Sequence, residues 1–126
     1  MTAPMPLVVQ PDAEAHVWAQ LKDLGGVTSW AYAATQLDPA GWIMAHFVQV
    51  DARHKSKQLA RDLAERIRQV MVGLPDVPWG LGCVCYCQPI EGPFWLPDPD
   101  GGPRYVARYE VRVHPPRTAA LAGADP

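Results

Sequence analysis

The sequence predicts one domain of the α/β (α+β) class, with a mostly antiparallel four-stranded sheet and two helices packed on it. Three observations indicate this: apolar residues at helical spacing over 59–74, strict alternation over 105–113, and a short turn over 38–41 between two apolar stretches. The expected order is helix, strand, strand, helix, strand, strand. A chain of 126 residues is long enough for one hydrophobic core, so we expect a domain over 1–114 and a flexible tail over 115–126.

The composition excludes several classes of protein. Apolar residues make up 48% and charged residues 19%, with a formal net charge of -2, which argues against a chain that binds nucleic acid over its whole surface. No apolar run approaches the roughly 20 residues needed to span a bilayer, and the first residues lack the pattern of a signal peptide. We therefore expect no contact with a membrane and a cytoplasmic protein.

The first helix is expected over 12–24. Pro11 and Asp12 are residues typical of a helix start, and Val17, Leu21 and Leu24 recur on one side of it. The glycine pair at 25–26 ends the pattern.

Two strands are expected next, over 28–37 and 42–50. The turn sequence DPAG at 38–41 joins them. This connection is too short for a parallel crossover, so the two strands should form an antiparallel hairpin.

The second helix is expected after Asp51. Its apolar stripe consists of Leu59, Leu63, Ile67, Val70, Met71 and Leu74. The segment also carries Arg53, Lys55, Lys57, Arg61, Arg66 and Arg68. This basic side is either a solvated surface with local ion pairs, such as Asp62 with Arg66, or a surface that binds a partner.

The third strand is expected over 81–88, ending at Pro89, and a proline- and glycine-rich loop should follow it. In the fourth strand, Tyr105, Ala107, Tyr109, Val111 and Val113 alternate with Arg104, Arg108, Glu110, Arg112 and His114. Such alternation predicts one buried face and one face that meets water or a partner, with Val106 as an exception on the charged side.

The three cysteines, Cys83, Cys85 and Cys87, occupy alternate positions of the third strand. Alternate side chains of a strand share a face, about 7 Å apart, so these thiols should not converge on a zinc ion or form disulfides with each other. We expect them to be reduced core residues, with metal or redox chemistry as the alternative. No phosphate loop, nucleophile elbow or zinc-protease motif is present. The sequence therefore predicts no catalytic residue, no metal site, no cofactor and no enzyme.

Phe94 and Trp95 lie in the expected loop after the third strand. They either fold back over the core of the domain or form an interaction surface, and long loops with exposed aromatic residues favour the second interpretation.

The order of elements resembles that of the tail terminator proteins of long-tailed bacteriophages, especially those that infect actinobacteria. Three stretches carry this resemblance: VVQPDAEAHVWAQLKDLGGV, VQVDARHKSKQLARDLAERIRQVM and EGPFWLPDPDGGPRYVARYEVRVHP. They span most of the chain, and none is a chemical motif.

The resemblance implies a structural virion protein that assembles as a homo-oligomeric, hexameric ring. Such a ring caps the major tail tube protein, ends tube polymerisation and contacts the head-tail connector or neck protein, while DNA only passes through its lumen. It implies location in the virion, and in the host cytoplasm during assembly. The candidate residues for the assembly interface are Phe94, Trp95, Arg104, Arg108, Glu110 and Arg112.

Two alternatives stay open. The chain could be another neck component, such as a head-closure or adaptor protein. It could also be a small ligand-binding or enzymatic domain that uses Cys85 or His46 in a pocket.

Overall fold

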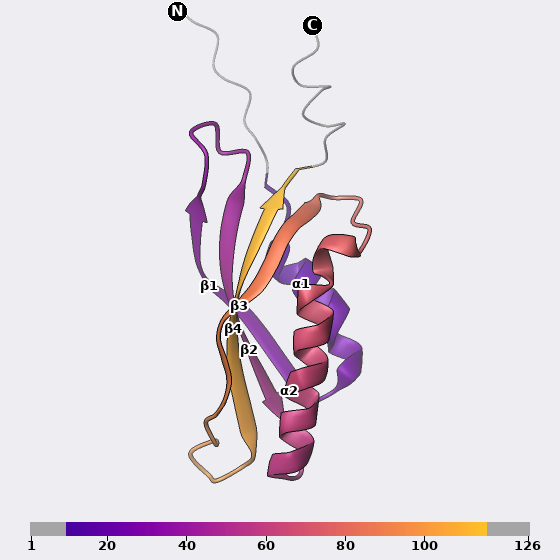
Figure 1. Cartoon of the computed structure of the whole chain (residues 1–126), viewed down its shortest axis with the longest axis vertical. Helices are drawn as coiled ribbons and strands as arrows, with labels where there is room; N and C mark the ends of the chain where they lie inside the picture. The colour runs from indigo at the N-terminus through magenta and orange to yellow at the C-terminus, as the bar shows by residue number, and fades with distance from the viewer. Residues whose placement is uncertain (1–9, 116–126) are drawn as a thin grey trace, which may run out of the picture.

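The chain folds as a mixed α+β domain with an antiparallel four-stranded sheet and two α-helices (Figure 1). The computed structural model describes residues 10–115, so residues 1–9 and all but the first residue of the tail expected over 115–126 lie outside the described residues. The helices are α1 (Ala13–Leu21) and α2 (Lys57–Val72), and the strands are β1 (Val27–Gln36), β2 (Met44–Arg53), β3 (Cys83–Trp95) and β4 (Arg104–His114). The predicted fold class and order of elements are confirmed.

The first helix begins where the sequence indicates, but its α-helical part ends at Leu21, three residues before the expected end. The Asp12 carboxylate accepts a hydrogen bond from the Ala15 amide at 3.0 Å, which caps α1. A 3-10 turn over Lys22–Leu24 then leads to Gly25 and Gly26, both of which have positive φ. At Gly26, an added Cβ would lie 2.3 Å from the Arg53 carbonyl oxygen, so this close approach requires glycine.

The second helix starts later than expected. Asp51 and its two neighbours continue β2, where Asp51, Ala52 and Arg53 pair with Val106, Tyr105 and Arg104 of β4. The Ser56 hydroxyl accepts a hydrogen bond from the Leu59 amide at 3.1 Å and caps α2. The helical pattern in the sequence therefore begins only after the strand has completed its pairing.

The strands lie in the order β1-β2-β4-β3, and all neighbours are antiparallel. The β1 and β2 strands form the predicted hairpin, and the Gly41 amide donates to the Asp38 carbonyl oxygen in the turn. The crossover through α2 and β3 places β4 in the centre of the sheet, beside β2. As a result, β1 and β3 are the two edge strands.

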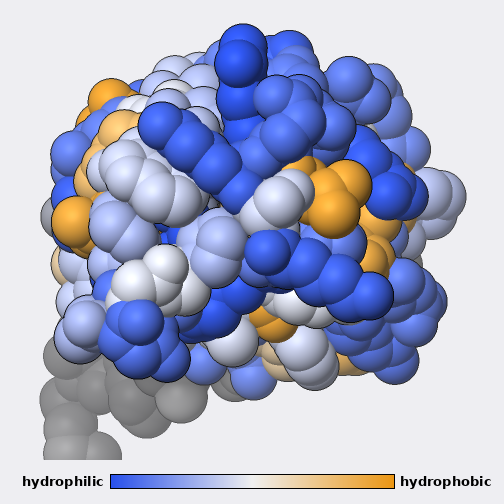
Figure 2. Space-filling view, turned by 90° about the horizontal axis from the view of Figure 1, so that it is seen from below, coloured by the Kyte–Doolittle hydropathy of each residue, from blue (hydrophilic) through white to orange (hydrophobic). Residues whose placement is uncertain are grey.

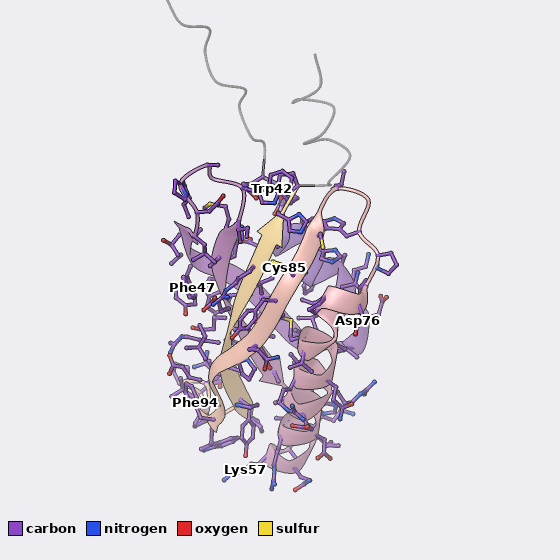
Figure 3. All side chains as sticks on the ribbon, turned by 45° about the horizontal axis from the view of Figure 1, so that its top comes forward. Trp42, Phe47, Lys57, Asp76, Cys85 and Phe94 are labelled. Atoms are coloured by element: carbon purple, nitrogen blue, oxygen red, sulfur yellow. The ribbon has the colours of Figure 1, made fainter. Side chains whose placement is uncertain are left out.

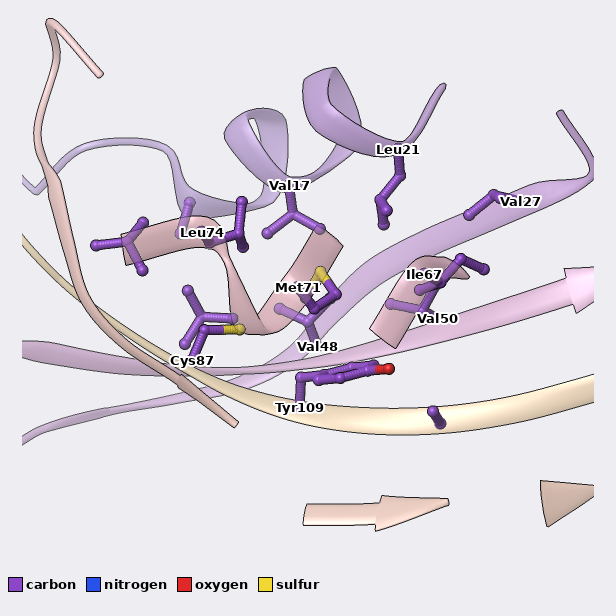
Figure 4. Close-up of a cluster of buried hydrophobic side chains, with 14 of the residues drawn as sticks. Val17, Leu21, Val27, Val48, Val50, Ile67, Met71, Leu74, Cys87 and Tyr109 are labelled. Atoms are coloured by element: carbon purple, nitrogen blue, oxygen red, sulfur yellow. The ribbon is translucent and has the colours of Figure 1, made fainter. Parts of the chain in front are cut away.

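Both helices pack on the same face of the sheet. Figure 4 shows this core, in which Val17 and Leu21 of α1 meet Ile67 and Met71 of α2 above the sheet. The sheet contributes Val48, Val50, Tyr109, Val111 and Val113. Among residues 10–115, no helix covers the opposite face, which we call the open face (Figure 1).

The third strand is longer than predicted. It continues through Pro89 to Trp95, and its pairing with β4 shifts register three times: between Val84 and Tyr86, between Pro89 and Glu91, and between Glu91 and Phe94. The segment expected as a loop over 89–95 is therefore an irregular half of an edge strand. The remaining turn, over 96–103, is closed by hydrogen bonds from the Asp98 amide to Gly102 and from the Gly101 amide to Asp98.

Candidate functional site

The open face brings together most of the predicted interface residues. The charged residues of β4 alternate with the partly buried Tyr105 and the buried Ala107, Tyr109 and Val111. The four charged side chains, Arg104, Arg108, Glu110 and Arg112, therefore share the open face. Phe94 pairs with Val106 and lies on the same face. The predicted division of β4 into a core side and a polar side is therefore confirmed.

Trp95 lies on the other side of the sheet. It pairs with Tyr105, whose ring packs against the core, and the two rings meet edge to face with centroids 5.4 Å apart. The Lys57 ammonium group of α2 lies 4.8 Å from the centre of the Trp95 ring. The expectation that Phe94 and Trp95 form one loop surface is wrong, because consecutive residues of a strand point to opposite faces.

Arg108 lies at the centre of the open face. Its guanidinium group donates to Glu91 of β3 at 2.6 Å and to the Gln49 side chain of β2 at 3.2 Å. Its charged centre also lies 5.9 Å from the ring centre of Tyr32 in β1. The hydrogen bond that Arg108 donates to Glu91 raises the pKa of Arg108. This one side chain therefore contacts all three of the other strands.

Arg112 repeats the arrangement towards the other end of β4. It forms an ion pair with Glu110 and lies over the ring of Tyr86 at 4.1 Å from the ring centre. Cation–π contacts of this kind hold an arginine flat against the sheet and leave its outer side available to a partner.

A buried carboxylate anchors the end of the open face that lies beside the β3–β4 turn. Asp51 of β2 has a fully buried side chain and accepts hydrogen bonds from Arg104 at 3.2 Å, Arg53 at 3.4 Å and Gln49 at 3.0 Å. Asp98 of the turn pairs with the same two arginines. Arg104 is therefore tied into a structural network and is less free to meet a partner than Arg108 or Arg112.

The charges of the open face balance. Its arginines are Arg53, Arg104, Arg108 and Arg112, and its acids are Asp51, Glu91, Asp98 and Glu110. Every arginine in this set has an acidic partner, so the face offers no excess positive charge to a phosphate backbone.

Aromatic side chains lie among these ion pairs. Trp30 and Tyr32 are 39% and 48% exposed, and Tyr32 lies near Phe47, with ring centroids 6.4 Å apart. Figure 3 shows Phe47 and Phe94 on the side of the sheet away from Lys57 and α2. The prediction from the sequence missed Trp30, Tyr32 and Phe47, although the alternation in the first two strands was a usable signal.

The helix side of the molecule carries a hollow. A hollow of about 420 Å³ lies between α2 and the β3–β4 hairpin, lined by Gln58, Arg61, Asp62, Glu65, Pro93 and Tyr105. Figure 2 shows this end of the molecule as mostly hydrophilic, with separate small hydrophobic areas. The expected ion pair between Asp62 and Arg66 is not formed: Asp62 accepts from Gln58, and Arg68 pairs with Glu65.

The cysteines do not share one face, contrary to the prediction. The register shift at Cys85 places Cys83 opposite His114 on the open face and Cys87 opposite Val111 in the core. Burial raises the pKa of Cys87 to about 12 and also raises that of Cys85. Neither thiol is activated as a nucleophile at neutral pH.

The described residues form neither a metal-binding cluster nor a membrane-spanning helix. Within residues 10–115, no group of three histidine, cysteine or acidic residues is arranged to hold a metal ion. None of the helices in this part of the chain is both long and apolar enough to cross a membrane. His46 lies on the core side of β2, where burial lowers its pKa.

The chain matches no protein-family model, and a search of curated proteins finds none that matches it.

Proposed function

We propose that the chain is a tail terminator subunit of a long-tailed bacteriophage. In this role it forms a ring, expected to be hexameric, on the last ring of the tail tube. The ring ends polymerisation of the major tail tube protein and contacts the connector or neck protein of the head, and DNA passes through the lumen. The protein would belong to the virion and to the host cytoplasm during assembly.

The open face is the observation that carries this proposal. Arginine and aromatic side chains are enriched where proteins contact each other, and charge-paired arginines can be buried in an interface with less penalty than isolated ones. Arg108 and Arg112 are each paired with an acidic side chain. Each also lies over a tyrosine ring, Tyr32 or Tyr86. A surface of this kind is better suited to another protein than to nucleic acid or a small substrate.

A closed ring requires two different surfaces on each subunit. The open face supplies one candidate. The second candidate is the basic side of α2, where Lys57, Arg61 and Arg66 form no salt bridge with any residue over 10–115. These two surfaces lie on opposite sides of the two-layer domain, so the open face of one subunit can meet the α2 side of its neighbour.

Deletion of the gene in the phage that carries it tests the proposed role. Loss of a terminator should give over-long tails that do not join to heads, as measured by electron microscopy. Tails of normal length that fail to join would instead indicate a head-closure or adaptor protein. Fully joined virions with normal tails would contradict any role in the neck.

Charge reversal tests the surface itself. Arg108→Glu removes the pairing with Glu91 and places an uncompensated acid in the open face, so ring formation and tail-length control should be lost. Asp76→Asn changes an exposed acidic side chain in the turn after α2, outside both candidate surfaces, and serves as the control. Intact rings with Arg108→Glu would show that the open face is not the contact.

A further inference from the structure

The first strand has an unprotected edge over residues 33–37. Two hydrogen bonds show which residues of this strand face β2. Before the bulge at Tyr32, the Gly26 carbonyl oxygen accepts from the Arg53 amide, and after the bulge the Leu37 amide donates to the Ile43 carbonyl oxygen. Since alternate residues of an antiparallel strand bond to the same neighbour, positions 33, 35 and 37 bond to β2. Ala34 and Gln36 therefore point their amide and carbonyl groups away from the sheet.

Only the first half of this edge is capped. The Ala31 amide donates to the Glu14 carboxylate of α1 at 3.0 Å. Within residues 10–115, no comparable hydrogen bond reaches the outward main-chain groups of Ala34 or Gln36. Residues 33–37 are all exposed, and β1 contains neither a charged residue nor a proline.

Natural sheets protect their edges with prolines, bulges or charges, and β3 carries such devices. It contains Pro89 and Pro93 as well as three register shifts against β4. At Gly92, where φ is 76°, an added Cβ would lie 2.5 Å from the Val106 carbonyl oxygen. The β3 edge therefore cannot offer a regular ladder to β1 of another subunit, whereas a second β1 can.

We propose that β1 pairs with β1 of a second copy, antiparallel and about a two-fold axis at Thr35. In this register, Ala34 exchanges both main-chain hydrogen bonds with Gln36 of the second copy. Thr35 faces Thr35 of the second copy, a pair that stabilises sheets, and Ala33 faces the exposed Leu37. No like charges face each other across this contact, because β1 contains no charged residue. The small side chains of Ala33, Ala34 and Thr35 let the two β1 strands approach each other.

This contact goes beyond the proposed function. A two-fold contact uses the same patch on both subunits, unlike the contacts between neighbours of a ring. It uses the β1 edge and leaves Arg108 free. It links two subunits, or two rings where rings form.

Oppositely charged variants at the axis test the contact. Thr35→Lys or Thr35→Glu alone places like charges face to face and should weaken self-association about five-fold or more. An equimolar mixture of the two variants should restore it, since each lysine then faces a glutamate. Ala33→Lys is the matched control, because its lysine would face Leu37, and it should change self-association little.

Sedimentation equilibrium with rising protein concentration gives the readout. The wild type should form a species with twice the mass of the monomer or ring, and Thr35→Lys should need about five-fold more protein, or more, to form it. A wild-type protein without such doubling, or variants at 33 and 35 with identical behaviour, would overturn the inference. Arg108→Glu separates the two proposals, because it should abolish rings and leave the doubling intact.

Discussion

Asp51 and Arg104 form an ion pair between neighbouring strands, with 3.2 Å between the carboxylate oxygen and the guanidinium nitrogen. The Asp51 side chain has no exposed surface, and Arg104 is only 18% exposed. Through Asp98, the same pair holds the β3–β4 turn against the end of β2. A buried carboxylate within a sheet is costly unless it is fully paired, and here it has three donors.

Replacement of Asp51 by alanine should destabilise the protein strongly. The change leaves Arg104 without its buried partner, so we expect a loss of about 2–4 kcal/mol in the free energy of unfolding. Chemical denaturation measures it. Glu65→Ala breaks an exposed pair and should cost less than about 1 kcal/mol, and equal losses in the two variants would contradict the structural role of Asp51.

The cysteines should differ in their reactivity. Cys85 is exposed, whereas Cys87 is buried and its pKa is raised to about 12 by burial. Alkylation of the folded protein should therefore modify Cys85 and leave Cys87 unmodified until the protein unfolds. Mass spectrometry of the peptides shows the order in which the two cysteines are alkylated. Rapid labelling of Cys87 in the folded state would contradict the placement of this residue in the core.

The cysteines also show how far the sequence could predict this fold. Regular patterns predict the buried side chains where the structure is regular, in the alternation of β4 and in most of the apolar stripe of α2. Leu59, the first residue of that stripe, is an exception, because it is 42% exposed. The regular alternation of a strand predicts that the side chains of Cys83 and Cys87 share one face of the sheet. One extra residue in β3 at Cys85 places Cys87 on the opposite face from Cys83.

The same limit applies to the candidate site. The charged side of β4 was predicted, but its partners Glu91, Gln49 and Tyr32 belong to three other strands and depend on register. The segment over 89–95 reads as a loop because proline and glycine are rare inside strands, yet both are tolerated at an irregular edge. Tertiary pairing with β4, which local sequence does not encode, keeps it in the sheet.

Stability should decrease in mild acid because of His16. This side chain is buried on α1, stacks on Trp79 at 4.2 Å between ring centroids, and has its pKa lowered by burial. Because the pKa of His16 is lower in the folded state, the unfolded chain binds the proton more readily. The stability that neutral His16 contributes is therefore complete above a pH of about 6.5. Below it, the free energy of unfolding falls by at most about 1.4 kcal/mol per pH unit.

His16→Phe tests this origin of the acid sensitivity. Phenylalanine preserves an aromatic ring against Trp79 and cannot be protonated. The slope of unfolding free energy against pH between about 5 and 6.5 should become shallower than in the wild type, with the remainder due to other groups such as His46. An unchanged slope would show that His16 does not contribute.

Phe94 and Trp95, adjacent in sequence, should respond differently to truncation. Trp95→Ala removes the edge-to-face contact with Tyr105 and the contact with Lys57, so we expect a loss of about 1–2 kcal/mol in unfolding free energy. Phe94→Ala acts on the open face, and, on the proposed function, it should weaken ring assembly more than Trp95→Ala does.

Denaturation of each variant and native mass spectrometry of its assemblies distinguish the two effects. The two variants should differ because Phe94 and Trp95, at successive strand positions, have their side chains on opposite faces of the sheet. If Trp95→Ala abolished assembly without loss of stability and Phe94→Ala left assembly intact, the open face would take no part in the ring contact, and Arg108→Glu would then leave rings intact.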